Sequence, residues 1–243
     1  MSEWLPKWLG EVYSRLLLHF GQSQFTIERA RNIGIKKPAV TLPRLAKSGW
    51  IVRVARGNYV VSEPIVAMIS CFQYDWRGMI KQKEYIPLLE FLVARLVAGY
   101  DKKLQGLVLF GSVARGNAKQ ESDVDLLVVA EDMPERYGDR VRRTLSILSG
   151  LDVLKREFYY KMKLYPKLDL ILLDAKEMQE PYPFLLDIVK EGIILFERGS
   201  YASGILNSLK SEFQRMGAVR VERPNGRWHW EIPAVGQARH GYA

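Results

Sequence analysis

The sequence predicts an α/β protein of the α+β kind, in which a sheet with covering helices follows a smaller helical domain. Short apolar strands alternate with amphipathic helices over residues 104–199, which is the pattern of a layered sheet. Three helices and a hairpin fill the first 62 residues, which is the pattern of a separate small domain. Because the chain has 243 residues and 48% of them are apolar, it can bury the cores of both domains.

The small domain, residues 1–62, begins with two helices. Apolar residues at helical spacing predict the first over 8–20. The second begins after Thr26 and stops at Gly34. A threonine hydroxyl can accept from the free N–H groups at a helix start, and glycine readily adopts the conformation that ends a helix.

A third helix and a hairpin complete this domain. Pro38 stands at the entry of the helix and Gly49 at its end. Pro43 lies inside the same stretch and favours a start nearer Thr41, because proline is best tolerated in the first turn. Runs of β-branched residues on both sides of Gly57 then predict the hairpin.

Residues 63–103 are predicted to form a helical linker between the domains, with one long helix over 80–104. The second domain, 104–199, and a C-terminal part, 200–243, follow. Buried strands are expected at 104–111, 124–132, 167–174 and 193–199. Helices are expected at 138–165, 181–192 and 201–217, and a last hairpin at 218–232 with Asn225 and Gly226 at its turn.

Composition narrows the classes of protein and of metal site. The single cysteine excludes an internal disulfide, and three scattered histidines exclude a Cys or His zinc site, so any metal must be held by oxygen ligands. The first residues lack the basic and apolar regions of a secretory signal, and the apolar stretch 85–100 is too short to cross a bilayer. We therefore expect a cytoplasmic protein that makes no contact with membranes.

The net charge of +9 is concentrated near the start of the chain. Residues 1–100 contain 14 Lys and Arg against 7 Asp and Glu, and residues 24–62 alone hold eight basic residues against one acid. Such an excess favours a polyanion as partner, and an ordinary solvated basic face is the alternative.

The segment 25–62 resembles the winged helix-turn-helix domains of prokaryotic regulators and of antitoxins in abortive-infection systems. The likeness lies in the pattern L..L.KSGWI.RV.RG.Y, from Leu42 to Tyr59. It implies that DNA is bound by a helix in the major groove and by a wing along the phosphates. The residues so assigned are Lys37, Arg44, Lys47, Arg53 and Arg56. The alternative is a winged helix used for protein contacts or dimerisation.

The stretch LVLFGSVARGNAKQESDVDLLVV, residues 107–129, contains most of the candidate site residues of the second domain. Gly111 lets phosphate oxygens approach the backbone, the Ser112 hydroxyl can donate to them, and a helix is expected to begin around 113–117 with free N–H groups. Asp123 and Asp125 lie on one face of the next strand, about 7 Å apart at their Cα atoms. Two carboxylates so placed can chelate Mg²⁺.

A third carboxylate on a neighbouring strand would complete a site for two metal ions. Asp169 has apolar neighbours on both sides, as expected of an acid on an otherwise buried strand. Asp174, at the end of the same strand, is better suited to cap the segment that follows. We therefore favour Asp169 as the third acid.

The segment 104–199 resembles the minimal nucleotidyltransferases of the DNA polymerase β-like superfamily. The signature is a Gly-Ser, an Ala-Arg-Gly and a Ser-Asp-x-Asp-Leu. Its members here are Gly111, Ser112, Ala114, Arg115, Gly116, Ser122, Asp123, Asp125 and Leu126, with Asp169 as the third acid. The resemblance implies a nucleotidyltransferase fold with a mixed sheet, ATP or another NTP as donor, Mg²⁺ as cofactor and pyrophosphate as product.

The resemblance also implies roles for these residues. Gly111 and Ser112 would hold the β- and γ-phosphates, Asp123 and Asp125 both metal ions, and Asp169 the ion that activates the nucleophile. Two interpretations of Arg115 stay open. In one it reaches the triphosphate or the acceptor, and in the other it is an exposed loop arginine that pairs with Glu121 or Asp132.

Minimal members of this family are often antitoxins that adenylylate a tyrosine of a partner HEPN-domain toxin. We therefore predict a nucleotidyltransferase that moves NMP, with AMP favoured, to a hydroxyl on a protein, and that binds DNA through residues 1–62. One alternative is a transcriptional regulator whose second domain only binds nucleotide or a partner, and another is addition of nucleotides to a nucleic acid end. Winged-helix proteins often dimerise, so a homodimer is a further expected partner state.

Overall fold

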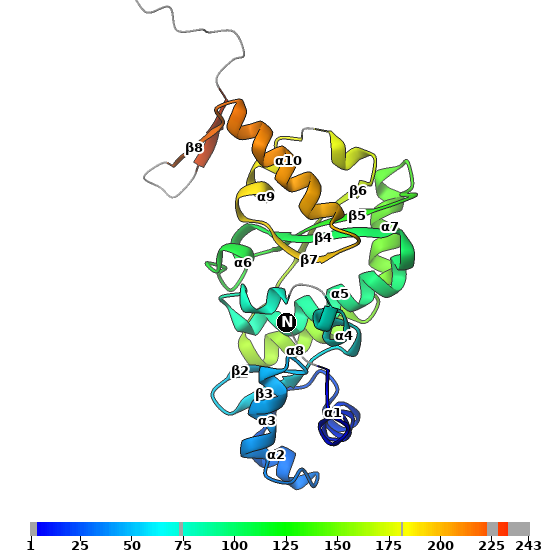
Figure 1. Cartoon of the computed structure of the whole chain (residues 1–243), viewed down its shortest axis with the longest axis vertical. Helices are drawn as coiled ribbons and strands as arrows, with labels where there is room; N and C mark the ends of the chain where they lie inside the picture. The colour runs from blue at the N-terminus through cyan, green and yellow to red at the C-terminus, as the bar shows by residue number, and fades with distance from the viewer. Residues whose placement is uncertain (1–3, 73–74, 181, 223–227, 233–243) are drawn as a thin grey trace, which may run out of the picture.

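The computed structural model describes residues 4–72, 75–180, 182–222 and 228–232. The N-terminal elements form one end of an elongated molecule, the four-stranded sheet lies beyond them, and the helices of the linker lie between (Figure 1). Within the described ranges, none of the helices is long and apolar enough to cross a lipid bilayer.

The N-terminal part contains the three predicted helices and the predicted hairpin, around a core of its own. Its helices are α1 (Lys7–Phe20), α2 (Ile27–Asn32) and α3 (Pro38–Lys47). Its strands are β1 (Phe25–Thr26), β2 (Ile51–Ala55) and β3 (Asn58–Val61), which form an antiparallel sheet in the order β1-β3-β2. The Thr26 hydroxyl accepts from the Arg29 N–H at 3.2 Å, so the predicted cap of α2 is present.

The third helix begins at Pro38, so the start near Thr41 predicted from Pro43 is wrong. Pro43 lies inside α3, where its ring nitrogen cannot donate to the carbonyl of Ala39. Both Ala39 and Pro43 are exposed, so water can solvate that carbonyl in place of the missing N–H.

The linker is helical, but its long helix is shorter than predicted. Its elements are α4 (Pro64–Phe72), the 3-10 turns η1 (Trp76–Gly78), η2 (Lys83–Tyr85) and η3 (Asp101–Lys103), and α5 (Ile86–Tyr100). α5 has Pro87 in its first turn, because a proline further along would remove a hydrogen bond of the helix. Residues 80–82 precede the 3-10 turn and are not helical.

The four predicted strands form one mixed sheet in the order β6-β5-β4-β7. The strands are β4 (Leu104–Phe110), β5 (Val124–Ala130), β6 (Leu168–Asp174) and β7 (Ile193–Glu197). β4 is antiparallel to both β5 and β7, whereas β5 and β6 are parallel. Both inner strands are almost fully buried, as expected for a sheet that is covered on its two faces.

Alternate residues of the strands enter two different cores. Leu107, Leu126 and Leu172 pack with α5 on one face of the sheet. Val108 and Leu127 pack on the other face, against α9 (Leu185–Glu191) and α10 (Tyr201–Arg215). Figure 1 shows these two helices on the opposite side of the sheet from α5. Because α5 shares a core with the sheet, it is packed as part of the second domain, whereas Ala67 of α4 belongs to the core of the N-terminal part.

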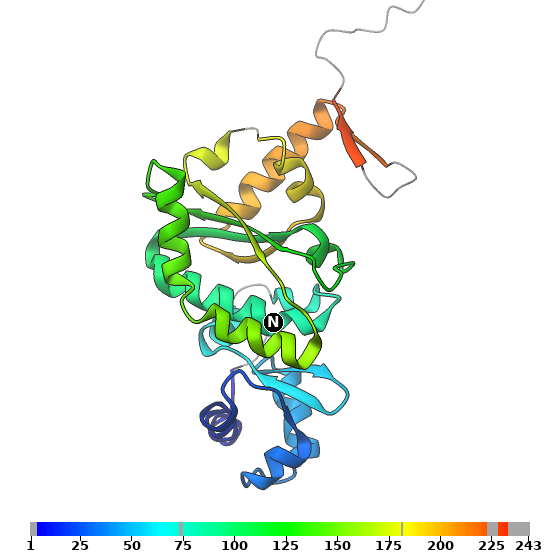
Figure 2. The same ribbon diagram turned by 180° about the vertical axis from the view of Figure 1, so that it is seen from behind.

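The single helix predicted over 138–165 is two helices, α7 (Tyr137–Ile147) and α8 (Leu151–Met162). Gly150 has φ +89°, in the left-handed region that ends helices, and it separates the two. α8 therefore turns away from α7 and runs beside α5 (Figure 2). The C-terminal hairpin consists of β8 (Val219–Glu222) and β9 (Trp228–Glu231), and its predicted turn at Asn225 and Gly226 lies outside the described residues.

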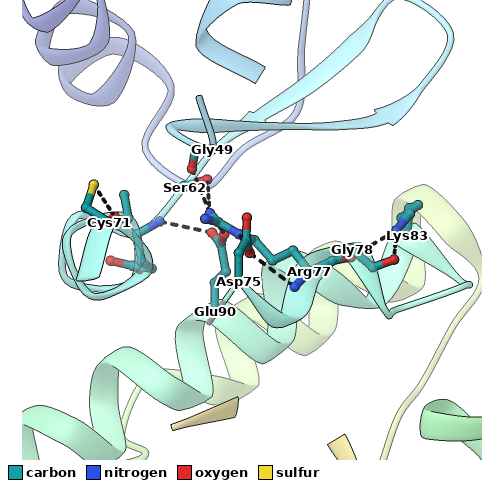
Figure 3. A network of polar contacts seen from close by, with 10 residues as sticks. Gly49, Ser62, Cys71, Asp75, Arg77, Gly78, Lys83 and Glu90 are labelled. Atoms are coloured by element: carbon teal, nitrogen blue, oxygen red, sulfur yellow. Dashed lines mark hydrogen bonds and ion pairs between the residues drawn. The ribbon is translucent and has the colours of Figure 1, made fainter. Parts of the chain in front are cut away.

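A buried ion pair joins the N-terminal part to the linker (Figure 3). Arg77 donates to Glu90 at 3.0 Å, to the Gly49 carbonyl at 2.7 Å and to the Ser62 hydroxyl at 3.2 Å. Glu90 has no exposed surface, and burial raises its pKa to about 7 against the opposing effect of Arg77. Arg77 therefore links two segments of the N-terminal part to helix α5.

Replacing Arg77 by Leu is expected to lower the free energy of unfolding by about 3 to 5 kcal/mol, because it leaves the Glu90 carboxylate buried without its counter-charge. Urea unfolding measures the change. Arg95→Leu is the matched control, since Arg95 is an exposed arginine on α5, the helix that carries Glu90. Equal, small effects of the two substitutions would contradict the role assigned to the buried pair.

Candidate active site

Gly111 stands where β4 ends and the short helix α6 (Gly111–Arg115) begins, two residues earlier than predicted. Its φ is +72°, a conformation that side chains disfavour. A Cβ atom here would lie 1.8 Å from Oδ2 of Asp125, so any other residue would collide with that carboxylate. Glycine is therefore required at 111 both by the backbone and by the acid that packs against it.

Three aspartates are brought to one end of the sheet by strand pairing. Asp125 pairs with Phe110 of β4 on one side and with Asp169 of β6 on the other. Asp123 precedes β5 by one residue and shares the face of Asp125, because side chains alternate along a strand. On each strand the acids continue the row of apolar residues that packs under α9 and α10.

The environment of Asp125 is electrostatically strained. Burial, and then the like charges of Asp169 and Asp123, raise the pKa of Asp125 to about 6, while Arg115 and the Ser112 backbone N–H act in the opposite direction. Asp125 is half-buried, whereas Asp123 and Asp169 are exposed. The acids thus form an anionic site that faces water. A bound cation would reduce the repulsion between their carboxylates.

The donor set fits a hard divalent cation, because it consists of carboxylate oxygens alone. Among the described residues, no three His, Cys, Asp or Glu side chains lie close enough together to coordinate a metal ion by themselves. Mg²⁺ commonly keeps several waters and is held by one or two carboxylates together with substrate phosphates, so an open set of acids suits it.

Asp174 is engaged elsewhere, at the far end of β6. Its carboxylate accepts from the backbone N–H of Met133 and of Lys176, both at 3.0 Å. This is the capping role expected of it, and it leaves Asp169 as the acid of β6 that stands beside Asp125. The Ser122 hydroxyl accepts from the Lys119 N–H at 2.8 Å and so closes the turn that leads into Asp123.

Arg115 pairs with neither Glu121 nor Asp132, the two acids considered as its partners if it were an exposed loop arginine. Its guanidinium forms an ion pair with Glu191 of α9 and lies 4.8 Å from the ring centre of Trp228 on the C-terminal hairpin. Asp132 pairs instead with Lys103 at 2.9 Å. Sequence reasoning missed Glu191 and Trp228, because both contacts join residues far apart in the chain and no local spacing announces them.

The linker holds the loop that follows α6. Lys81 donates to the Arg115 carbonyl at 3.0 Å. The Gln82 side chain pairs with both backbone groups of Ala118, accepting from its N–H at 2.9 Å and donating to its carbonyl at 3.0 Å. Sequence reasoning missed Lys81 and Gln82 as well. Their position as polar residues just before a buried helix was the only feature of the sequence that could have pointed to them.

The five residues assigned to DNA lie in two groups on the N-terminal part. All five are exposed. Lys37, Arg44 and Lys47 belong to the start and body of α3, while Arg53 and Arg56 lie on β2 and on the turn beyond it. Arg44 also lies 5.9 Å from the ring centre of Trp8 on α1.

Comparison with known proteins identifies the second domain. Residues 96–194 match the family described as Nucleotidyltransferase domain. MJ1305 of Methanocaldococcus jannaschii, provisionally named a protein adenylyltransferase, is 26% identical over 147 residues, which are 60% of this chain and 92% of that protein. MJ0141 of the same organism, with the same provisional name, is 53% identical over 32 residues, which are 13% of this chain and 32% of that protein.

Among solved structures, the chain is similar to a chain in the complex of tri-AMPylated Shewanella oneidensis HEPN toxin with MNT antitoxin. The identity is 21%, the alignment covers 53% of this chain and 86% of that one, and the TM-score is 0.35. The family match and the relatedness to MJ1305 are sufficient to conclude that the chain contains a nucleotidyltransferase domain and is an enzyme of that class.

Gly111→Ala is expected to abolish binding of Mg²⁺·ATP, because the new methyl group displaces the Asp125 carboxylate from its place beside the Ser112 N–H. Calorimetric titration measures the affinity. Gly199→Ala is the matched control, since Gly199 also has a positive φ, +55°, but open space around its Cα. If Gly111→Ala bound as tightly as the control, the close approach of residue 111 to Asp125 would have no role in the site.

Proposed function

We propose that this enzyme transfers AMP from Mg²⁺·ATP to a hydroxyl group of a protein. The observation that supports it most is the in-register pairing of Asp125 with Asp169, with Asp123 on the same face and Gly111 in contact with Asp125. ATP is used as a complex with Mg²⁺, so its binding site must hold the cation and the phosphates next to each other. A cluster of acids for the cation beside a glycine-serine turn for the phosphates meets this requirement.

Each residue has a defined task in the proposed reaction. The acceptor oxygen forms a bond to the α-phosphorus, the bond from that phosphorus to the α,β-bridging oxygen breaks, pyrophosphate leaves, and the hydroxyl proton passes to solvent. Asp123, Asp125 and Asp169 would hold Mg²⁺, which supplies charge neutralisation for the phosphates and the attacking oxygen. Gly111 and Ser112 receive the β- and γ-phosphates, and Arg115 lies beside the same turn with a positive charge.

A protein is the acceptor we favour. The two curated relatives carry names that describe protein adenylyltransferases, and one of them aligns with this chain over 92% of its own length. The antitoxin resemblance narrows the acceptor further to a tyrosine of a HEPN-type toxin, which we include in the proposal.

Transfer of label from α-³²P-ATP tests the reaction and its acceptor together. The samples are a purified HEPN-type toxin, bulk tRNA and DNA, each with and without Mg²⁺. We expect label on the toxin alone and only with Mg²⁺. Asp125→Asn and Asp169→Asn should each reduce it at least about 100-fold, since a lost ligand removes charge stabilisation of the transition state.

Asp174→Asn is the matched control on the same strand, and it should retain transfer because Asp174 lies at the far end of β6 from the three acids. The asparagine oxygen still accepts from one of the two backbone N–H groups that the carboxylate binds. Label found only in tRNA or DNA would contradict a protein acceptor. Equal losses in the Asp169 and Asp174 variants would contradict the assignment of Asp169.

We also propose that residues 1–62 form a winged helix-turn-helix domain that binds DNA. The order of three helices and a hairpin, the strand order β1-β3-β2 and the exposure of all five assigned basic residues support it. In such domains the third helix lies in the major groove and the wing contacts phosphates, which places α3 and the β2–β3 turn on the DNA.

A gel shift with the DNA upstream of the gene tests this proposal. Arg44→Ala combined with Lys47→Ala should abolish the shift at physiological salt, and each lost phosphate contact should reduce the slope of log K against log salt by about 1. Lys210→Ala combined with Arg215→Ala removes the same charge from exposed positions on α10 and should leave the shift unchanged. Loss of the shift in both pairs would indicate attraction to net charge rather than a defined face.

A further inference from the structure

The C-terminal hairpin is attached to one face of helix α9. Trp228 and Trp230 of β9 each donate their indole N–H to the same oxygen of Asp187, at 2.9 and 3.0 Å. Asp187 and Glu191 are four residues apart on α9, so both carboxylates point to the same side of the helix. The hairpin therefore covers the face of α9 that carries these two acids.

That face also holds Arg115, the arginine of the glycine-serine turn. Arg115 forms an ion pair with Oε1 of Glu191, and Arg220 of β8 pairs with Oε2 of the same carboxylate at 3.3 Å. The ring of Trp228 contacts both guanidinium groups, at 4.8 Å from Arg115 and 4.0 Å from Arg220. Arg115 is thus fixed by a carboxylate from α9 and an aromatic ring from β9.

The two guanidinium groups of this cluster share one ion-pair partner on α9. The side chains of Glu191 and Arg220 are each only 9% exposed, and that of Arg115 is 25% exposed. Arg220 also pairs with Glu222, which is 69% exposed and so offers only a solvent-screened charge. Asp187, the other acid on this face of α9, accepts from the two indole N–H groups. The Glu191 carboxylate is therefore divided between Arg115 and Arg220.

The guanidinium groups also retain unused donors. The Nε atoms of Arg115 and Arg220 are buried and have no hydrogen-bond partner among the described residues. Buried donors usually have a partner, so an unpaired guanidinium N–H is suited to a ligand that supplies anionic acceptor oxygens.

We propose that the C-terminal hairpin is part of the donor site, and that Trp228 and Glu191 are positioning residues that hold Arg115 ready for the triphosphate of ATP. This proposal rests on the function proposed above and extends it to Trp228, which lies outside the matched residues 96–194. An arginine on a five-residue helix would otherwise sample many conformations, and ordering it in advance removes that entropic loss from nucleotide binding.

The proposal makes a specific prediction about affinity for nucleotide. Trp228→Ala should raise the dissociation constant of Mg²⁺·α,β-methylene-ATP roughly 3- to 30-fold, the range that corresponds to one cation–π contact. The analogue carries a methylene group in place of the bridging oxygen that the reaction breaks, so calorimetry reports binding alone. Trp228→Phe should restore most of the affinity, because it keeps an aromatic ring under Arg115.

A double-mutant cycle decides whether Trp228 acts through Arg115. Arg115→Ala should weaken binding at least as much as Trp228→Ala, and Trp228→Ala should have no further effect once Arg115 is gone. Trp230→Ala is the matched control: it removes the other indole bonded to Asp187 but no contact of Arg115, and it should bind nucleotide like the wild type. Additive effects of the Arg115 and Trp228 substitutions, or equal effects of the two tryptophan substitutions, would overturn the proposal.

A second measurement separates this proposal from the proposed function. The four proteins of the cycle are the wild type, Arg115→Ala, Trp228→Ala and the double variant. Their thermal unfolding midpoints without ligand report whether Arg115 and Trp228 are coupled in the folded chain. Coupled midpoints with no nucleotide binding by the wild type would contradict the proposed function and, with it, the role of the hairpin in a donor site. Uncoupled midpoints would overturn the positioning role by themselves, whatever the wild type binds.

Discussion

The parallel, in-register pairing of β5 with β6 is the constraint on which the whole site depends. It sets Asp125 and Asp169 side by side on the same face, although their positions in the chain differ by 44. Burial, and then repulsion from the neighbouring carboxylate of Asp169, raise the pKa of Asp125. The folded chain tolerates this because the apolar residues further along both strands are buried under α9 and α10 and hold the register.

Around this pair, the rest of the molecule limits movement of the turn at Gly111 and of the segment after it. Asp125 packs directly against Gly111, Lys81 and Gln82 hold the segment from Arg115 to Ala118, and Glu191 holds the Arg115 side chain. The linker that supplies Lys81 and Gln82 also carries Arg77, which is bonded to Gly49 and Ser62 of the N-terminal part. One short segment thus contacts both the candidate DNA-binding domain and the candidate active site.

Local patterns in the sequence were sufficient for most elements and for the pair of acids on β5. The four strands, the hairpins and the capping role of Asp174 follow from apolar spacing, turn residues and chain position. Local reasoning failed where solvent or a single glycine decides the outcome. Pro43 lies within α3 because the carbonyl it leaves unpaired is exposed, and Gly150 divides a stretch whose apolar pattern is continuous. The partners of Arg115 could not be predicted, because Glu191 and Trp228 approach it only through the packing of α6, α9 and the last hairpin.

The most direct test of the central claim is a crystal structure of the full chain soaked with Mn²⁺ and α,β-methylene-ATP, with anomalous scattering used to locate the metal. Mn²⁺ takes the oxygen ligands that Mg²⁺ takes and can be identified by its scattering. We expect an anomalous peak bound by Asp125 together with Asp123 or Asp169, and a triphosphate on the backbone of Gly111 and Ser112. A peak bound by Asp174 and Glu131 at the opposite end of β5, with no triphosphate at Gly111, would contradict the claim.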